Sequence, residues 1–374
     1  MKKNFFFLAA AALAFASCSV DETLEVNQGE AIGFRTVVNG NTRATAKTAF
    51  ADADVINVYA DYAGSKYFQD NFTFATGEGF HSANKYYWPA TVDASNAVTF
   101  SAIYKATQVA DAPGTISAFT PAAEVASQVD VLFAKTKVEN VSAQFKSTGV
   151  VLNFRHALSQ VVVKVKNSNP NMVFDIKEVK FAFLNTAGNF NGSTVANTDT
   201  KIVNSADVAA NHLTQAMWTG LTPASPTYAN AYTQTSASAN FTSSTATALG
   251  EPWMLVPQSQ TAATAYTAAT AGTFMNGSYI AVKMVIKNAE GGVIADGATA
   301  NDGVWCCWPA TVNWTPGYKY NYVVELSDGG YFESNQTSTD ENLDPVLGGN
   351  EIFFSAACTI DEWVDADGAV NQLP

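Results

Sequence analysis

The chain has 374 residues, of which 47% are hydrophobic and only 14% are charged. This apolar content excludes wholesale disorder, and the length suits two domains better than one. The formal net charge is −13, and no basic cluster follows the extreme N-terminus, so nucleic acid is excluded as a partner.

The N-terminus has the pattern of an export signal. Two lysines precede an apolar run over 5–16, which is too short to span a bilayer as an ordinary helix. Small residues then stand directly before Cys18, which resembles the lipobox of bacterial lipoproteins. We therefore expect a lipoprotein signal peptide over 1–17 and acylation of Cys18, which would anchor the chain at the outer membrane. An ordinary signal peptide followed by a chance cysteine is the alternative.

Residues 18–43 read as a tether followed by a first strand. The segment is polar up to about residue 30, and the run 32–38 then carries strand-forming residues. The next five residues form a turn-rich, exposed segment that ends at Arg43. An arginine in an accessible loop is a site for a trypsin-like protease.

Short runs in the body of the chain alternate between apolar and polar residues. Such alternation predicts strands with one face on a core and the other in water, and turn-forming clusters separate the runs. The clearest predicted strands cover 55–59, 161–166, 280–287, 318–326 and 352–360. Short helices are expected only around 122–128 and 207–216, so the predicted fold class is all-β, of the sandwich type.

A repeated segment indicates two related domains. Trp88-Pro89-Ala90-Thr91-Val92 recurs as 308–312, and proline suits the start or the edge of a strand. We place the boundary near Gly149, with an N-terminal β-sandwich over 44–149 and a C-terminal β-sandwich over 150–374. The Ser/Thr-rich stretch 191–250 is predicted to form long loops of the second domain.

Catalytic and metal-binding patterns are absent from the sequence. The three histidines, His81, His156 and His212, lie far apart, and no zinc, nucleophile-elbow or phosphate-loop motif occurs. We expect a packing or hydrogen-bonding role for His156. The prediction is that the chain is not an enzyme and needs no cofactor or metal, with a hidden pair of glycosidase carboxylates as the open alternative.

Three cysteines follow Cys18 in the chain: Cys306, Cys307 and Cys358. Neighbouring residues on a strand point to opposite faces, so only one of Cys306 and Cys307 can face a given core. An exported protein can form disulfides. The sequence allows two alternatives: one buried disulfide with one leftover thiol, or three unpaired thiols.

Several segments, taken in order, resemble the Bacteroidales-type (type V) fimbrillins, and the resemblance covers essentially the whole mature chain. It implies two tandem transthyretin-like β-sandwich domains. The matching segments are the lipobox at Cys18, Ile32-Gly33-Phe34-Arg35, Thr42-Arg43-Ala44, Phe154-Arg155-His156-Ala157-Leu158, Leu255-Val256-Pro257-Gln258, the run 314–320 and the closing run 352–363.

The resemblance also implies a mode of assembly. An Arg-specific surface protease would cut between Arg43 and Ala44, which would make 18–43 a propeptide. Loss of the first strand would open an apolar groove, and a strand from a neighbouring subunit would fill it by β-strand addition. The donor-strand candidates are Ile352, Phe354, Ala356, Ile360 and Trp363.

The implied function is a structural subunit of a cell-surface fimbria (pilus) or a fimbria-associated adhesin. Its partners would be other fimbrial subunits and an unidentified host or bacterial surface ligand. Stalk, anchor and tip roles are all open. The alternative is a surface lipoprotein that binds glycans and never polymerises, supported by the 12% aromatic content, the Ser/Thr-rich stretch and the acidic charge.

Overall fold

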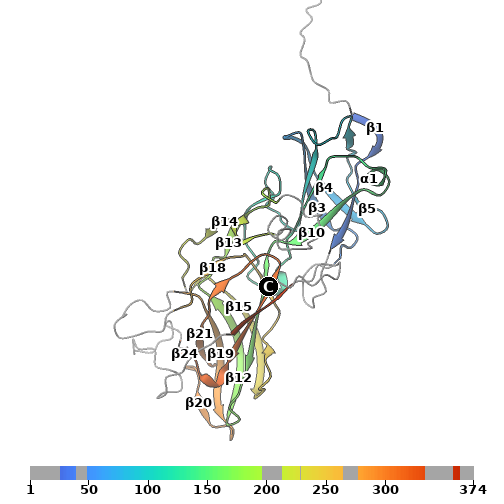
Figure 1. The fold of residues 1–374 in the computed structure, drawn as a ribbon. Helices are drawn as coiled ribbons and strands as arrows, with labels where there is room; N and C mark the ends of the chain where they lie inside the picture. Colours follow the sequence, from blue (N-terminus) through green and yellow to red (C-terminus); the bar gives the residue numbers. More distant parts are fainter. Residues whose placement is uncertain are drawn as a thin grey trace, which may run out of the picture.

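The computed structural model describes residues 26–38, 49–195, 213–227, 229–263, 277–332 and 357–362. Strands dominate these residues, so the predicted all-β class is confirmed. Two strand-rich bodies lie end to end, with a small sheet between them (Figure 1). No helix among the described residues is long and apolar enough to cross a membrane.

Seven strands close into a barrel in the N-terminal half. Around the barrel the order is β10-β2-β5-β4-β3-β7-β9, and the long strands send alternate apolar side chains into one core. The bounds are β2 (Phe34–Val38), β3 (Val55–Tyr62), β4 (Ser65–Ala75), β5 (Gly79–His81), β7 (Val98–Tyr104), β9 (Leu132–Val138) and β10 (Val150–His156).

Three elements outside the barrel ladder, two strands and a helix, complete this half. Strand β1 (Val26–Ala31) pairs antiparallel with β6 (Tyr87–Pro89), in a region that the sequence predicts to be part of a polar tether. Backbone pairing with β6 requires no apolar alternation, which explains why the sequence pattern does not reveal β1. Helix α1 (Ala143–Thr148), whose N-terminus is capped by the Ser142 hydroxyl, connects β9 to β10.

Two sheets with a shared apolar core form the C-terminal half. Side chains from both sheets meet in this core, among them Trp253, Trp314 and Phe181. The first sheet has the order β16 (Thr247–Ala248), β11 (Ser159–Lys166), β23 (Tyr318–Glu325) and β25 (Ala357–Glu362), with β17 (Trp253–Leu255) also beside β11. The second has the order β15 (Ala231–Phe241), β12 (Met172–Ala182), β19 (Tyr279–Asn288), β21 (Val304–Pro309) and β24 (Tyr331–Phe332), with β20 (Val293–Ala295) beside β19.

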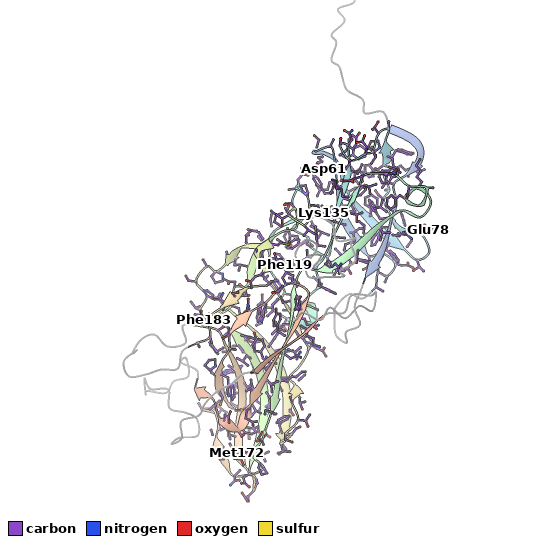
Figure 2. All side chains as sticks on the ribbon, viewed as in Figure 1. Asp61, Glu78, Phe119, Lys135, Met172 and Phe183 are labelled. Atoms are coloured by element: carbon purple, nitrogen blue, oxygen red, sulfur yellow. The ribbon has the colours of Figure 1, made fainter. Side chains whose placement is uncertain are left out.

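A third sheet mixes strands from the two halves. It consists of β8 (Thr115–Phe119), β13 (Ala187–Asn191) and β14 (Trp218–Thr222), and it lies over a separate apolar cluster at the junction. Phe119 marks this junction, and side chains fill the space between the two bodies (Figure 2). The Trp218 indole N–H donates to the carbonyl oxygen of Ala157 at 2.7 Å, so the junction also has specific polar contacts.

The remaining elements are short. They are the 3₁₀ turns η1 (Val125–Ser127), η2 (Gln215–Met217) and η4 (Leu326–Asp328), and the paired strands β18 (Ser259–Gln260) and β22 (Val312–Asn313). The first turn falls within the predicted helical range 122–128, and the second overlaps the end of the range 207–216.

The repeated Trp-Pro segment ends strands rather than starting them. Pro89 is the last residue of β6, and Pro309 is the last residue of β21. Trp88 and Trp308 are each only 2% exposed, one in the barrel core and the other in the C-terminal core. The repeat therefore marks an equivalent packing role in the two halves.

Strand β10 starts where the sequence places the domain boundary. It pairs in parallel with β2 and antiparallel with β9, so it completes the N-terminal barrel. The division into two tandem transthyretin-like domains, with the predicted bounds, stays a prediction. Part of the Ser/Thr-rich stretch is regular structure, since β15 is an eleven-residue strand beside β12. As an edge strand with much of its surface in water, β15 carries Thr and Ser where a central strand would carry Val and Ile.

Candidate functional site

The first strand of the predicted propeptide lies inside the N-terminal barrel. Strand β2 pairs with β10 over five residues, from Phe34 opposite Val150 to Val38 opposite Phe154. On its other side β2 pairs with β5 at one position only, Phe34 opposite Phe80. We call the space that residues 32–38 occupy in the barrel the first-strand slot.

Phe34 fills the slot with an aromatic side chain that is 2% exposed. Its ring lies edge-on to Phe72, with the ring centroids 4.9 Å apart, and edge-on to Phe100 at 5.1 Å. Ile32, two residues earlier, is 5% exposed. Burial of one Phe side chain contributes roughly 1.5–3 kcal/mol, so removal of β2 would leave a costly apolar vacancy in the core.

Two glycines let the backbone of the first strand pass close to its neighbours. Gly79 and Gly149 both have a φ of +83°, which favours glycine. A Cβ at Gly79 would lie 2.5 Å from the carbonyl oxygen of Phe34, and one at Gly149 would lie 2.7 Å from the carbonyl oxygen of Gly33. Sequence reasoning assigns neither glycine to a site, because both contacts join residues far apart in the chain.

Hydrogen bonds hold the start of the strand on both sides. The amide of Ile32 donates to the Tyr86 carbonyl oxygen at 2.7 Å, and the amide of Val150 donates to the Gly33 carbonyl oxygen at 2.8 Å. The segment entering β2 is therefore bound through its backbone as well as through Phe34.

The predicted cleavage site, Arg43-Ala44, lies outside the described residues, as does the predicted lipidation site Cys18. The sequence contains three arginines, and the other two lie on paired strands. Arg35 is in β2 opposite Val151, and Arg155 is in β10 with only 7% of its surface exposed. Proteases cut exposed, flexible segments, so the pairing of β2 and β10 should protect the bonds after Arg35 and Arg155 from cleavage.

Of the donor-strand candidates, the described residues include Ile360. It lies in β25, which pairs antiparallel with β23 over six residues, and Ile360 stands opposite Tyr320. Strand β25 lies at one edge of its sheet, and among the described residues β23 is its partner strand there. The other candidates, Ile352, Phe354, Ala356 and Trp363, lie outside the described residues.

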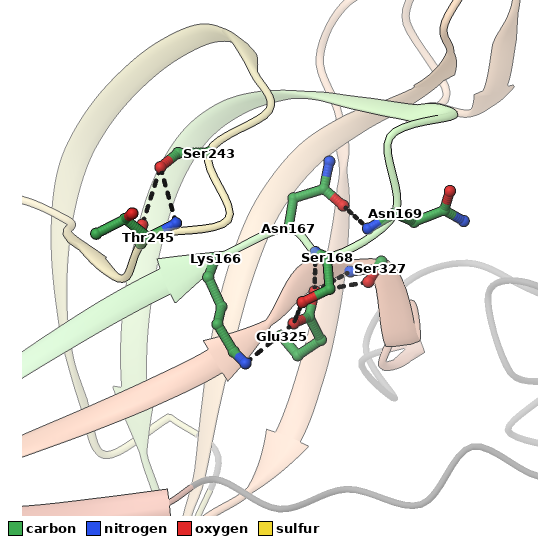
Figure 3. A network of polar contacts seen from close by, with 8 residues as sticks. All are labelled: Lys166, Asn167, Ser168, Asn169, Ser243, Thr245, Glu325 and Ser327. Carbon is green, nitrogen blue, oxygen red and sulfur yellow. Dashed lines mark hydrogen bonds and ion pairs between the residues drawn. The ribbon is translucent and has the colours of Figure 1, made fainter.

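A polar cluster fixes the ends of the strands next to β25. The Glu325 carboxylate, at the end of β23, accepts hydrogen bonds from the amide of Ser168 at 2.8 Å and from the hydroxyls of Ser168 and Ser327 at 2.6 Å (Figure 3). Lys166 Nζ lies 3.4 Å from the same carboxylate. Partial burial alone would raise the pKa of Glu325, but these hydrogen bonds lower it below its ordinary value.

His156 has the structural role that the sequence predicts. Its Nδ1 lies 2.7 Å from Oδ2 of Asp130, and both residues are buried. Cys306 and Cys307 face different apolar clusters, as expected for neighbours on a strand, and both are buried. Burial raises the pKa of the Cys306 thiol, which keeps it protonated and unreactive.

Metal ligands do not gather anywhere in the part of the chain that the structure describes. No group of three or more His, Cys, Asp or Glu side chains there could hold an ion. The distinctive arrangement among the described residues is the buried and tightly held first strand.

The chain thus combines a barrel that holds an apolar first strand with a second body made of two sheets. A family model described as Fimbrillin-like matches residues 42–344, more than half of the chain. The chain therefore belongs to the Fimbrillin-like family. Among curated protein sequences none matches the chain.

Solved structures of Bacteroidales proteins align with most of the chain at low identity. A "putative cell adhesion protein" from Bacteroides ovatus has 16% identity and a TM-score of 0.45, and the match covers 90% of this chain and 97% of that one. Another, from Parabacteroides distasonis, has 11% identity and a TM-score of 0.47, with 89% and 99% covered. A fimbrial assembly protein from Parabacteroides distasonis has 11% identity and a TM-score of 0.37, with 79% and 90% covered.

Proposed function

We propose that the chain is a structural subunit of a cell-surface fimbria, or an adhesin carried on one, that assembles by strand exchange. Membership of the Fimbrillin-like family supports a structural rather than an enzymatic role. The observation that carries the proposal is the position of β2, which lies between β10 and β5 in the closed barrel and directly precedes the segment containing Arg43.

Removal of the residues before Ala44 would expose one continuous edge. Five residues of β10, from Val150 to Phe154, would lose the strand with which they pair. The core around Phe72 and Phe100 would lose the Phe34 ring. Unpaired backbone beside an apolar groove is the arrangement that an added strand satisfies, because it supplies both hydrogen bonds and buried side chains.

The C-terminal segment from Ile352 onward is the proposed donor. Ile360 lies in an edge strand, so release of β25 breaks one strand pair and leaves β23 paired with β11. The candidate side chains for the groove are Ile352, Phe354, Ala356, Ile360 and Trp363.

Export precedes assembly in this proposal. A signal peptide over 1–17 directs the chain out of the cytoplasm, and acylated Cys18 holds the precursor at the outer membrane with its body exposed at the surface. Cleavage after Arg43 would separate the body from that anchor.

The test is treatment of the purified full-length precursor with an Arg-specific protease. The expected result is a new N-terminus at Ala44, followed by fibres in the electron microscope and high-mass species in gel filtration. Arg43→Gln is the matched control and should stay intact and monomeric. A chain lacking 352–374 should be cut but form no fibres.

Two outcomes would overturn the proposal. One is a cut chain that stays monomeric at high concentration. The other is specific binding of a glycan by a monomer that never polymerises, which would favour the glycan-binding alternative.

A further inference from the structure

Phe50 lies just after the predicted cleavage site, and its ring is packed into the end of the barrel. The ring centroid is 5.0 Å from that of Phe80, 5.2 Å from that of Tyr104 and 5.2 Å from that of Phe154, all in edge-on geometry. Phe74 lies beside it, at 6.1 Å. Residues from four strands of the barrel therefore surround one side chain that would stay with the body after a cut at Arg43.

A short turn holds Phe50 in place, and its partners also lie outside the propeptide. The Asp54 carboxylate accepts a hydrogen bond from the amide of Ala51 at 2.7 Å and another from the Tyr104 hydroxyl at 2.9 Å. The backbone of Ala53 and Asp54 exchanges hydrogen bonds with Phe74 at 3.1 and 2.8 Å. None of these contacts involves a residue of the predicted propeptide, 18–43.

Phe50 lies at the level where the first-strand slot ends. Its contact Phe154 is the β10 residue opposite Val38, the last residue of β2. Phe34, at the other end of β2, packs its ring against Phe72 and Phe100 and pairs with Phe80, which also contacts Phe50. The Phe50 cluster thus extends from Phe80, opposite Phe34 on the β5 side of the slot, to Phe154, opposite Val38 on the β10 side where β2 ends.

We propose that Phe50 is a retained plug that closes the Phe154 end of the first-strand slot and so sets the register of the incoming strand. This proposal rests on the proposed strand exchange. A strand can slide by two residues and keep the same side chains facing the core, so an open-ended groove does not define register. With Phe50 in place, the incoming strand must end its pairing with β10 opposite Phe154, where Val38 lies in the precursor.

The chemistry of the accepted strand follows from the two ends of the slot. The strand needs a large apolar side chain at the position of Phe34, and its last residue paired with β10 must come four residues later, opposite Phe154. In another segment the large side chain could stand closer to the N-terminus. To place that side chain in the Phe34 pocket, the segment would have to shift so that its C-terminal end passes the position of Val38, toward Phe50.

Two labelled peptides test the plug on the full chain after it has been cut at Arg43. One has the sequence of residues 26–38, and the other exchanges the residues at positions 32 and 34, which moves the Phe two positions toward the N-terminus. We expect the cut wild-type chain to bind the native peptide at least tenfold more tightly than the exchanged one. In Phe50→Ala the ratio should fall below threefold, because the exchanged peptide can then slide.

Two further variants separate register from general damage to the core. Phe50→Leu keeps most of the apolar volume and should restore most of the discrimination. Phe119→Ala removes a buried ring at the junction, away from the slot, and should leave the ratio unchanged.

The outcomes distinguish this proposal from the one on which it depends. A cut Phe50→Ala chain that keeps the tenfold ratio overturns the plug alone, as does Phe119→Ala lowering the ratio equally. A wild-type chain that is not cut after Arg43, or that binds neither peptide once cut, overturns the proposed strand exchange and the plug with it.

Discussion

Gly79 approaches Phe34 so closely that a Cβ at position 79 would lie 2.5 Å from the Phe34 carbonyl oxygen. Real Cβ atoms do not come that close to a backbone oxygen, so any side chain at this position must push β2 away from β5. Gly77, in the same hairpin, has nearly the same φ, +84° against +83°, but nothing lies within 4 Å of its Cβ position. A comparison of Gly79 with Gly77 therefore separates the effect of the close contact with β2 from the effect of the positive φ.

Gly79→Ala should therefore destabilise the precursor far more than Gly77→Ala. The strained φ alone costs about 1–2 kcal/mol for an L-residue, and this is the expected loss for Gly77→Ala. For Gly79→Ala we expect about 3 kcal/mol or more, since the contact with β2 adds to the strain. Urea unfolding of both variants measures the difference. Equal losses in the precursor would show that the first strand has no close contact there.

Phe34→Ala should destabilise the precursor but not the cut protein. Truncation of a buried Phe costs about 3–5 kcal/mol, because apolar contacts are lost and a cavity remains. After a cut at Arg43 and release of the first strand, the variant and the wild type become the same molecule, so their unfolding midpoints should coincide. The cut chains are thus the internal control. A loss below about 1 kcal/mol in the precursor would contradict the packing of Phe34.

Alternation in the sequence is enough to predict the strands that line a core. Ile280, Val282, Met284 and Ile286 were expected to share a face, and all four lie in the C-terminal core as residues of β19. The same rule does not reveal β15, because an edge strand in water can be built from Thr, Ser and Ala. Apolar alternation therefore predicts a strand that buries one face in a core. It gives no signal for a strand that buries few of its side chains.

The candidate site was only partly predictable. The first strand could be read from the run 32–38, but its central place in the barrel, in parallel pairing with β10, depends on contacts across more than a hundred residues. Gly79, Gly149 and Phe50 are ordinary residues in the sequence. Their roles follow from distances that local pattern does not encode.

Limited proteolysis should cut the native precursor at one of its three arginines. Arg35 and Arg155 lie on strands of the barrel, and a protease must bind several residues of extended chain around the bond it cuts. We expect one early cut after Arg43, detected by mass spectrometry, and cuts at the other two only in urea. In Arg43→Gln the native chain should resist the protease. Early cutting after Arg35 would mean that β2 is not held in the barrel.

The carboxylate of Glu325 predicts a stability change at acidic pH. Hydrogen bonds from Ser168 and Ser327 hold its pKa below the ordinary value of 4.5, although partial burial opposes them. A group whose pKa is lower in the folded state binds fewer protons there than in the unfolded chain. Its contribution is present above the unfolded pKa and is lost as the pH falls through the folded pKa.

Glu325→Gln should therefore destabilise the protein at neutral pH by about 1 kcal/mol, the net worth of a hydrogen bond to a partly exposed group. The difference from the wild type should shrink below pH 4.5 and vanish once the wild-type carboxylate is protonated as well. Urea unfolding at a series of pH values measures it, with the exposed Glu124→Gln as the matched control. A difference in unfolding free energy that stays constant across the series would mean that the Gln side chain destabilises the protein through its geometry and not through the loss of charge. No difference at neutral pH would show that Glu325 does not fix the end of β23 beside β25.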